Sequence, residues 1–385
     1  MADEDDSAFD PSTVIAAISA FLLGETPTLR RAEVEALSGI PAEVTRERWR
    51  ALGFPEVDDE TVAFTHTDVE ALRITQKLID LGILAEDSEL AFIRTTGRMY
   101  ARLAEWQARN MLSSITGDGT EEGLTLDRLD EIIPLAEQVQ AYVWRRHLAG
   151  AATRLLLRDS TDTEGGTMCV GFADIVGYTS QSRKLTTGEL AAMVERFEGV
   201  ATSRIVDHGG QVIKTIGDEI LFVTDRPIDA ARLALELLDE HLNDEDFPQV
   251  RIGMAYGSVL NRLGDVFGPV VNVSSRLTSI ARPGRAVVDR ALAEQLRDDE
   301  QLRVRRMRRV SVKGYPHLEP WSLKRPRDDD DPRPSVRDAI EEVLEDASTQ
   351  VDEAARAAKS AVEKAADRPR HQRSGKDRRP KPEKG

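Results

Sequence analysis

The sequence has little of what secreted and membrane-spanning proteins require. Cys169 is the only cysteine in 385 residues, so no disulfide can form within the chain. The longest apolar run, Val14 to Leu23, is well short of the ~20 residues that cross a bilayer, and no secretory signal opens the chain. We therefore expect a cytoplasmic, soluble protein. The apolar flanks of Cys169 favour a core residue over a reactive thiol.

An excess of basic residues is also missing. The chain has 52 basic and 68 acidic side chains and a formal net charge of -16. Binding to bulk nucleic acid requires a basic face that neutralises phosphates, so we do not expect nucleic acid to be the main partner. A local basic patch could still be present despite the acidic net charge. The length predicts two folded units and a tail rather than one compact domain.

Changes in composition divide the chain into five segments. The first is acidic and expected to be disordered, the second has helical periodicity, and the third is a polar, glycine-rich linker. The fourth mixes strands and helices, and the fifth is a charged tail with one amphipathic helix between disordered stretches. These segments are residues 1–10, 11–158, 159–166, 167–325 and 326–385.

The fourth segment predicts an α+β fold of the ferredoxin-like type. Apolar runs and helical periodicities follow one another in the order β-α-β-β-α-β, with further short strands at the end. Strands are expected at residues 168–175, 210–216, 219–224, 249–255, 285–289, 303–312 and 320–324, with an extended segment at 261–266 and helices at 187–207, 225–242 and 269–280.

Three short stretches of this segment carry the chemistry. Residues 171–179 (GFADIVGYT) are a strand that ends in Asp174, and residues 212–219 (VIKTIGDE) are a strand and a turn that ends in Asp218. Residues 265–276 (DVFGPVVNVSSR) lead into a helix on which Asn272 and Arg276 share one face, because they are four positions apart.

Each of these residues alone has an ordinary structural explanation. A strand-end aspartate is usually a turn residue, Lys214 could be a solvated charge, and Arg251 a charge at a strand edge. Their occurrence together and in this order is more specific. Over about residues 167–324 the chain resembles the catalytic domain of the class III nucleotidyl cyclases.

The resemblance implies a site for two divalent metal ions, Mg²⁺ or Mn²⁺. It assigns the metal ligands to the carboxylates of Asp174 and Asp218 and the backbone carbonyl of Ile175. Oxygen ligands of this kind suit hard cations, and the His and Cys clusters that bind zinc are absent from the sequence.

The resemblance also implies the reaction, which is conversion of ATP to 3′,5′-cyclic AMP and pyrophosphate. It places Asn272 and Arg276 on the α-phosphate in the transition state and Lys313 on the terminal phosphates. Arg251 aligns, over a short motif, with a second phosphate-binding cation. Lys214 and Asp265 align with the pair that reads adenine.

In the resembling family these groups are divided between two protomers. A single chain that carries both sets therefore implies a head-to-tail homodimer with two equivalent sites, and an inactive monomer. The same resemblance leaves open a catalytically inactive, cyclase-like sensor, although a decayed site would be expected to lack at least one of these groups.

The helical segment is open to two interpretations. Its layout resembles the regulatory region that precedes the catalytic domain of some soluble bacterial cyclases, and His147 could sense pH there or be an ordinary surface histidine. Residues 29–52 instead resemble the helix-turn-helix of MerR-type DNA-binding regulators, with Arg46, Arg48 and Arg50 on the second helix. The amphipathic helix at residues 336–358 could dock on a partner or remain solvated.

Overall fold

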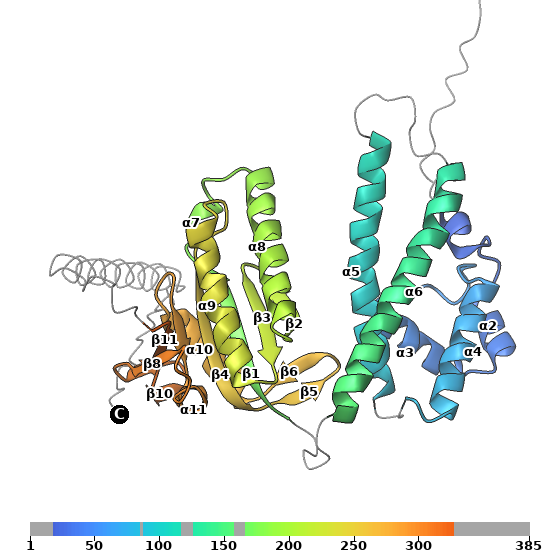
Figure 1. The fold of residues 1–385 in the computed structure, drawn as a ribbon. Helices are drawn as coiled ribbons and strands as arrows, with labels where there is room; N and C mark the ends of the chain where they lie inside the picture. Colours follow the sequence, from blue (N-terminus) through green and yellow to red (C-terminus); the bar gives the residue numbers. More distant parts are fainter. Residues whose placement is uncertain (1–17, 85–87, 117–125, 158–165, 327–385) are drawn as a thin grey trace, which may run out of the picture. The chain divides into compact units, whose positions relative to one another are not determined.

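A computed structural model describes residues 18–84, 88–116, 126–157 and 166–326 (Figure 1). The predicted disordered start lies outside the described residues, as do the linker except for residue 166 and the tail, with its amphipathic helix at residues 336–358, except for residue 326. No helix in the described part of the chain is both long enough and apolar enough to cross a membrane.

Three short helices build a small core in the helical part. These are α2 (Arg31–Ser38), α3 (Ala42–Leu52) and α4 (His66–Asp80). Leu29, Val34, Phe64 and Val69 form a buried cluster between them. Thr65 caps α4, since its side chain accepts a hydrogen bond from the backbone N–H of Asp68.

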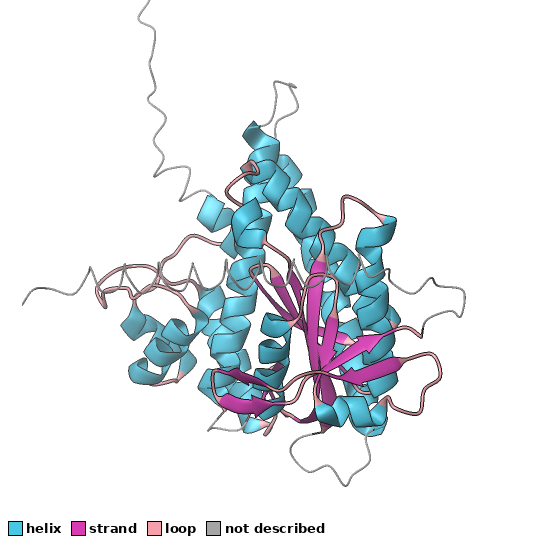
Figure 2. Ribbon diagram, turned by 90° about the vertical axis from the view of Figure 1, so that its left-hand side faces the viewer, coloured by secondary structure: helices cyan, strands magenta, loops and turns pink. Residues whose placement is uncertain are grey.

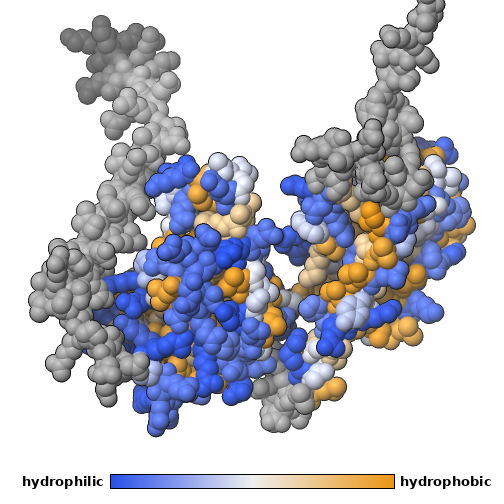
Figure 3. All heavy atoms as spheres, turned by 45° about the horizontal axis from the view of Figure 1, so that its top comes forward, coloured by the Kyte–Doolittle hydropathy of each residue, from blue (hydrophilic) through white to orange (hydrophobic). Residues whose placement is uncertain are grey.

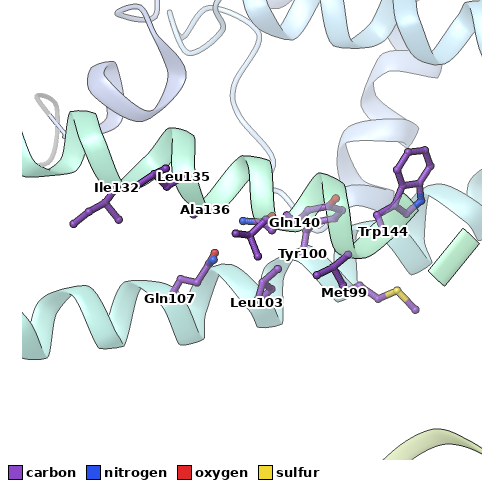
Figure 4. Close-up of a pocket in the computed structure, with 11 residues that line it drawn as sticks. Met99, Tyr100, Leu103, Gln107, Ile132, Leu135, Ala136, Gln140 and Trp144 are labelled. Carbon is purple, nitrogen blue, oxygen red and sulfur yellow. The ribbon is translucent and has the colours of Figure 1, made fainter. Parts of the chain in front are cut away.

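Two long helices follow, α5 (Glu89–Thr116) and α6 (Leu126–Leu157). They line a cleft of about 630 Å³ whose walls are almost entirely apolar (Figure 4). Apolar side chains also gather on the surface of the helical part (Figure 3), and the large exposed ones on these two helices include Met99, Tyr100, Val139 and Trp144.

The remaining part contains a β-sheet with helices packed around it (Figure 2). The sheet has seven strands in the order β2-β3-β1-β4-β7-β11-β8. Antiparallel pairs join β2 with β3, β3 with β1, β1 with β4 and β7 with β11, whereas β4 and β7 are parallel. The strands are β1 (Thr167–Ile175), β2 (Gln211–Ile216), β3 (Glu219–Thr224), β4 (Val250–Ser258), β7 (Ala286–Val288), β11 (Trp321–Lys324) and β8 (Arg303–Arg306).

Helices cover both faces of this sheet. Alternate residues of β1 point to opposite faces: Val170 packs in the cluster that includes Leu277 of α10 (Pro269–Ile280), whereas Cys169 lies within range of the charge of Asp229 on α9 (Pro227–Asn243). Burial raises the pKa of the Cys169 thiol to about 12, consistent with a core residue. The helix α8 (Thr187–Asp207) packs on α9 and the β2–β3 end of the sheet.

The order β1-α8-β2-β3-α9-β4 confirms the predicted ferredoxin-like α+β class. Two predicted segments were wrong in detail. Residues 261–266 are not one extended segment but a hairpin of β5 (Leu260–Arg262) and β6 (Asp265–Phe267), since Leu263 and Gly264 have positive φ. Residues 303–312 divide into β8 and β9 (Val310–Val312), and β9 pairs with β10 (Tyr315–Leu318), which the sequence pattern did not predict.

Candidate active site

Cross-strand register places four charged residues on one face of the sheet. Asp174, near the end of β1, lies opposite Glu219 on β3 and opposite Arg251 on β4. Lys214 on β2 lies opposite Leu221, two positions after Glu219, and therefore shares this face. Directly paired residues of neighbouring strands point the same way, so the register alone gathers these side chains.

Asp174, one of the two predicted metal-binding carboxylates, is largely enclosed and pairs with Arg251. Its Oδ2 accepts a hydrogen bond of 2.7 Å from Nε of Arg251, and its side chain is 13% exposed. Burial raises the pKa of Asp174, the hydrogen bond and charge of Arg251 lower it, and the nearby Asp218 carboxylate raises it. Asp174 and Asp218 are therefore close enough to repel one another.

The turn between β2 and β3 brings Asp218 to the end of β1. The backbone N–H of Ile175 donates to the carbonyl oxygen of Asp218 at 3.1 Å, and the Ile175 side chain is buried. Gly217 provides the left-handed conformation that this tight turn requires, with φ of +67°. The three residues predicted to bind metal, Asp174, Ile175 and Asp218, thus meet at one point of the sheet.

Glu219 is a site residue that the sequence analysis missed. Burial and the charges of Asp174 and Asp218 raise its pKa to about 7, against a smaller opposing effect of Arg251. In the sequence, Glu219 could have been noticed because it directly follows Asp218. However, side chains of consecutive strand residues normally point to opposite faces of a sheet, which argues against two adjacent site residues. Asp218 belongs to the turn, so that rule does not separate the two side chains.

This group of carboxylates suits hard cations. Asp174, Asp218 and Glu219 place negative charges within range of one another, which is costly without a compensating positive charge. Among the described residues there is no cluster of three or more His, Cys, Asp or Glu side chains with the geometry of a preformed metal site. A pair of carboxylates assisted by backbone and substrate oxygens is instead the arrangement that Mg²⁺ commonly uses.

The predicted adenine-reading pair is assembled within one chain. Nζ of Lys214 on β2 lies 2.5 Å from Oδ2 of Asp265 at the start of β6. The second oxygen of Asp265 accepts a hydrogen bond from the backbone N–H of Val266 at 2.9 Å, which orients the carboxylate. Lys214 and Asp265 are 51 positions apart, so the β5–β6 hairpin is what joins them.

Asn272 and Arg276 lie on α10, which the sheet holds firmly. Ser274 and Thr278 are buried, and their hydroxyl groups donate to backbone carbonyl oxygens of β1. Asn272 is exposed and Arg276 is half-buried. No hydrogen bond or ion pair within the described ranges joins their side chains to Asp174 or Asp218.

Lys313 is exposed in the turn between β9 and β10. This hairpin is attached to the beginning of α10, because the Tyr315 hydroxyl group donates to the carbonyl oxygen of Pro269 at 3.4 Å. Val312 and Tyr315 also pack against the hydrophobic cluster beneath α10. The hairpin that carries Lys313 therefore packs against the helix that carries Asn272 and Arg276.

The arginines of the helix-turn-helix segment have acidic partners. Arg46 pairs with Asp59, Arg50 pairs with Glu56, and Arg48 is buried against Glu89. Binding to DNA would require these side chains to leave carboxylates for phosphates. This pairing favours a role for α3 in packing the helical part over a role in DNA recognition.

Comparisons with known proteins decide the family. Residues 161–325 match the model of the adenylate and guanylate cyclase catalytic domain. The chain is also 36% identical over 329 residues to an adenylate cyclase of Glutamicibacter nicotianae, a match that covers 80% of this chain and 82% of the relative. The chain belongs to the class III nucleotidyl cyclases.

One further relative and one solved structure are also similar to this chain. This cyclase is 38% identical over 265 residues to an adenylate cyclase of Streptomyces coelicolor, covering 67% of this chain and 69% of the relative. It is also similar to the solved catalytic core of a rhodopsin-guanylyl cyclase with converted specificity in complex with ATPαS. That structure aligns with a TM-score of 0.40 at 21% identity, over 43% of this chain and 99% of the other.

Proposed function

We propose that this cyclase converts ATP to 3′,5′-cyclic AMP and pyrophosphate at sites shared between two copies of the chain. The observation that carries the proposal is the contact between Lys214 and Asp265 on the hairpins beside the Asp174–Asp218 pair. The names of the Glutamicibacter and Streptomyces relatives support the same substrate.

The pair of Lys214 and Asp265 has the polarity that adenine requires. The ammonium group of Lys214 can donate to ring N1, and the carboxylate of Asp265 can accept from the 6-amino group. Guanine presents a donor at N1 and an acceptor at position 6, so both protein groups would lose their partners. Unpaired polar groups in a binding site discriminate strongly between substrates.

Cyclisation requires the ribose 3′-hydroxyl group to attack the α-phosphorus while pyrophosphate leaves. Asp174, Asp218 and the carbonyl of Ile175 would hold two divalent cations, Mg²⁺ or Mn²⁺, which when bound activate this hydroxyl group and neutralise the triphosphate. Arg276 and Asn272 would donate to the α-phosphate oxygens as charge develops there. Lys313 would bind the terminal phosphates.

A head-to-tail homodimer would bring these groups together around one substrate. Within one chain, the described hydrogen bonds link Asp174 with Arg251 and Lys214 with Asp265, and none of them joins either pair to the side chain of Asn272 or Arg276. A second copy would bring its own Lys214, Asp265, Asn272 and Arg276 against the Asp174 and Asp218 of the first. A monomer should therefore be inactive.

The proposal is tested by incubating purified protein with ATP and Mn²⁺ and measuring cyclic AMP by chromatography. Asp174→Ala and Asp218→Ala should abolish the product, whereas Asp246→Ala, an exposed aspartate in another loop, should leave the rate unchanged. Absence of cyclic AMP with the unmodified chain would refute the proposal.

Shared sites are tested by mixing two inactive variants. Asp174→Ala and Asn272→Ala impair different halves of the composite site, so a mixed dimer retains one intact site. Mixing equal amounts should restore roughly a quarter of the activity, if chains exchange at random. Recovery no greater than the sum of the separate variants would argue for sites within one chain.

We propose that the helical part regulates the catalytic part. Its ordered core, with Arg48 buried against Glu89 and a capped α4, supports a structural role rather than that of a passive leader. A variant that lacks residues 1–158 should differ from the full chain in specific activity or in its pH dependence. Identical activity at every pH would refute this role.

A further inference from the structure

Arg251 makes a contact within the chain that phosphate binding alone does not explain. Its guanidinium Nε lies 2.7 Å from Oδ2 of Asp174, and the two side chains are 33% and 13% exposed. The arginine was expected to bind phosphate, yet its contact within the chain is with Asp174, one of the two carboxylates proposed to bind metal.

The charge of Arg251 acts on the whole carboxylate group. It stabilises the ionised forms of both Asp174 and Glu219, which flank one another across β1 and β3. Asp174 lies between Glu219 and Arg251 in the cross-strand row. The guanidinium of Arg251 is therefore placed beside the group of carboxylates, where a positive charge offsets their mutual repulsion.

A metal ion and this guanidinium bind the same carboxylate. The Nε–H of Arg251 is directed at a lone pair of Oδ2, and a cation bound by Asp174 requires lone pairs of the same carboxylate at about 2.0–2.1 Å for Mg²⁺. Two positive charges at one carboxylate also repel each other. Metal binding therefore opposes the ion pair electrostatically.

We propose that Arg251 is an internal counter-ion that competes with the divalent cation for Asp174. In the metal-free protein it holds the Asp174 carboxylate in place and offsets the repulsion among Asp174, Asp218 and Glu219. When a metal ion binds, the guanidinium is displaced from Oδ2 and becomes available to the triphosphate. This inference rests on the proposed function, because it takes Asp174 as a metal ligand.

Competition makes a prediction that a pure phosphate-binding role does not. Removing the guanidinium should strengthen binding of the metal alone, whereas a residue that only contacts phosphate would leave it unchanged. A hydrogen bond between charged groups is strong, but partial exposure of Arg251 weakens its effect. We expect Arg251→Met to bind Mn²⁺ about tenfold more tightly, in the absence of nucleotide.

The experiment is a titration of the full-length protein with Mn²⁺ alone at pH 8, with free Mn²⁺ measured by electron paramagnetic resonance. Arg251→Lys keeps a charge but loses the planar fork, so its Mn²⁺ affinity should lie between those of the wild type and Arg251→Met. Arg196→Met removes an arginine that pairs with Asp244 on the surface, and it should bind Mn²⁺ as the wild type does.

Unchanged or weaker Mn²⁺ binding by Arg251→Met would overturn the inference. If that variant does not fold, as judged by circular dichroism, Arg251→Lys decides: an affinity above the wild type supports competition, and an equal or lower one refutes it. Asp174→Asn and Asp218→Asn distinguish an error in the proposed metal site from an error in the proposed competition. If they bind Mn²⁺ like the wild type, the metal site itself is wrong; if they lose it while Arg251→Met is unchanged, only the competition is wrong.

Discussion

Substitution of Gly253 by alanine tests whether the contact between α10 and β4 positions α10, the helix that carries the proposed phosphate-binding residues Asn272 and Arg276. Gly253 lies on β4 where α10 crosses it, and a Cβ atom there would be 2.0 Å from the backbone nitrogen of Thr278 and 2.5 Å from its Oγ1. Ordinary contacts begin near 3.4 Å. The helix and strand must therefore separate by about 1.4 Å, the difference between 3.4 and 2.0 Å.

The cost follows from what this separation disturbs. Overpacking a core typically costs about 1–3 kcal/mol, and the upper end applies because the clash is with backbone rather than with a flexible side chain. The shift also strains the hydrogen bond from Thr278 to the carbonyl oxygen of Phe172, which is already 3.4 Å long. We expect a loss of about 3 kcal/mol in the free energy of unfolding.

Activity should fall by more than stability alone explains. Asn272 and Arg276 move with α10, and a displacement of about 1 Å at a reacting centre can reduce the rate about 100-fold. Cyclic AMP formation should therefore decrease by about this factor under conditions in which the variant is fully folded.

The measurements are urea denaturation followed by circular dichroism and the rate of cyclic AMP formation. Gly257→Ala is the matched control, since it lies on the same strand and face, and its Cβ would be 3.6 Å from Val270. That variant should remain within about 0.5 kcal/mol of the wild type. A Gly253→Ala protein with wild-type stability and activity would refute the reasoning.

Three further predictions concern other parts of the molecule. The native pKa of Glu219, about 7, exceeds its ordinary value of 4.5, so ionised Glu219 destabilises the metal-free fold; this penalty is absent below about pH 4.5 and complete above about pH 7. Glu219→Gln should therefore stabilise the metal-free protein by about 1 kcal/mol at pH 8, a value reduced for the access of water to the site, and should not stabilise it at pH 4.5. Equal changes in the free energy of unfolding at both pH values, measured by urea denaturation, would contradict this prediction. Lys214→Met should lower the ratio of kcat/KM for ATP to that for GTP at least about tenfold, and an unchanged ratio would show that the pair with Asp265 does not read the base. Glu89→Ala leaves the buried Arg48 guanidinium without its carboxylate and should cost the helical part about 3 kcal/mol in urea denaturation, whereas a loss below about 0.5 kcal/mol would show that the pair is not stabilising.

Local sequence determined most of the secondary structure of the catalytic part. The helix at residues 187–207 and the helix at residues 269–280 were predicted at their observed bounds. Both begin with a recognisable signal, a Thr186 capping box with Glu189 in one and Pro269 in the first turn in the other. Such signals involve residues three or four positions apart, so the sequence alone contains them.

Turns that depend on unusual backbone conformations were less accessible. The β5–β6 hairpin requires Leu263 at φ of +54°, a conformation that leucine rarely adopts, so the sequence does not indicate a turn at this position. It was therefore expected to be one extended segment. This hairpin matters for the site, because it carries Asp265 to Lys214.

The sequence alone predicted the chemistry of the site, because Asp174, Asp218 and the residues of the 265–276 segment occur in an ordered pattern that can be recognised without coordinates. Only the tertiary structure decided the partners of these side chains. Arg251 is 77 positions from Asp174, and the arginines of α3 meet carboxylates on other segments. The physical reason is that an ion pair depends on strand register and helix packing, which are properties of the whole fold rather than of neighbouring residues.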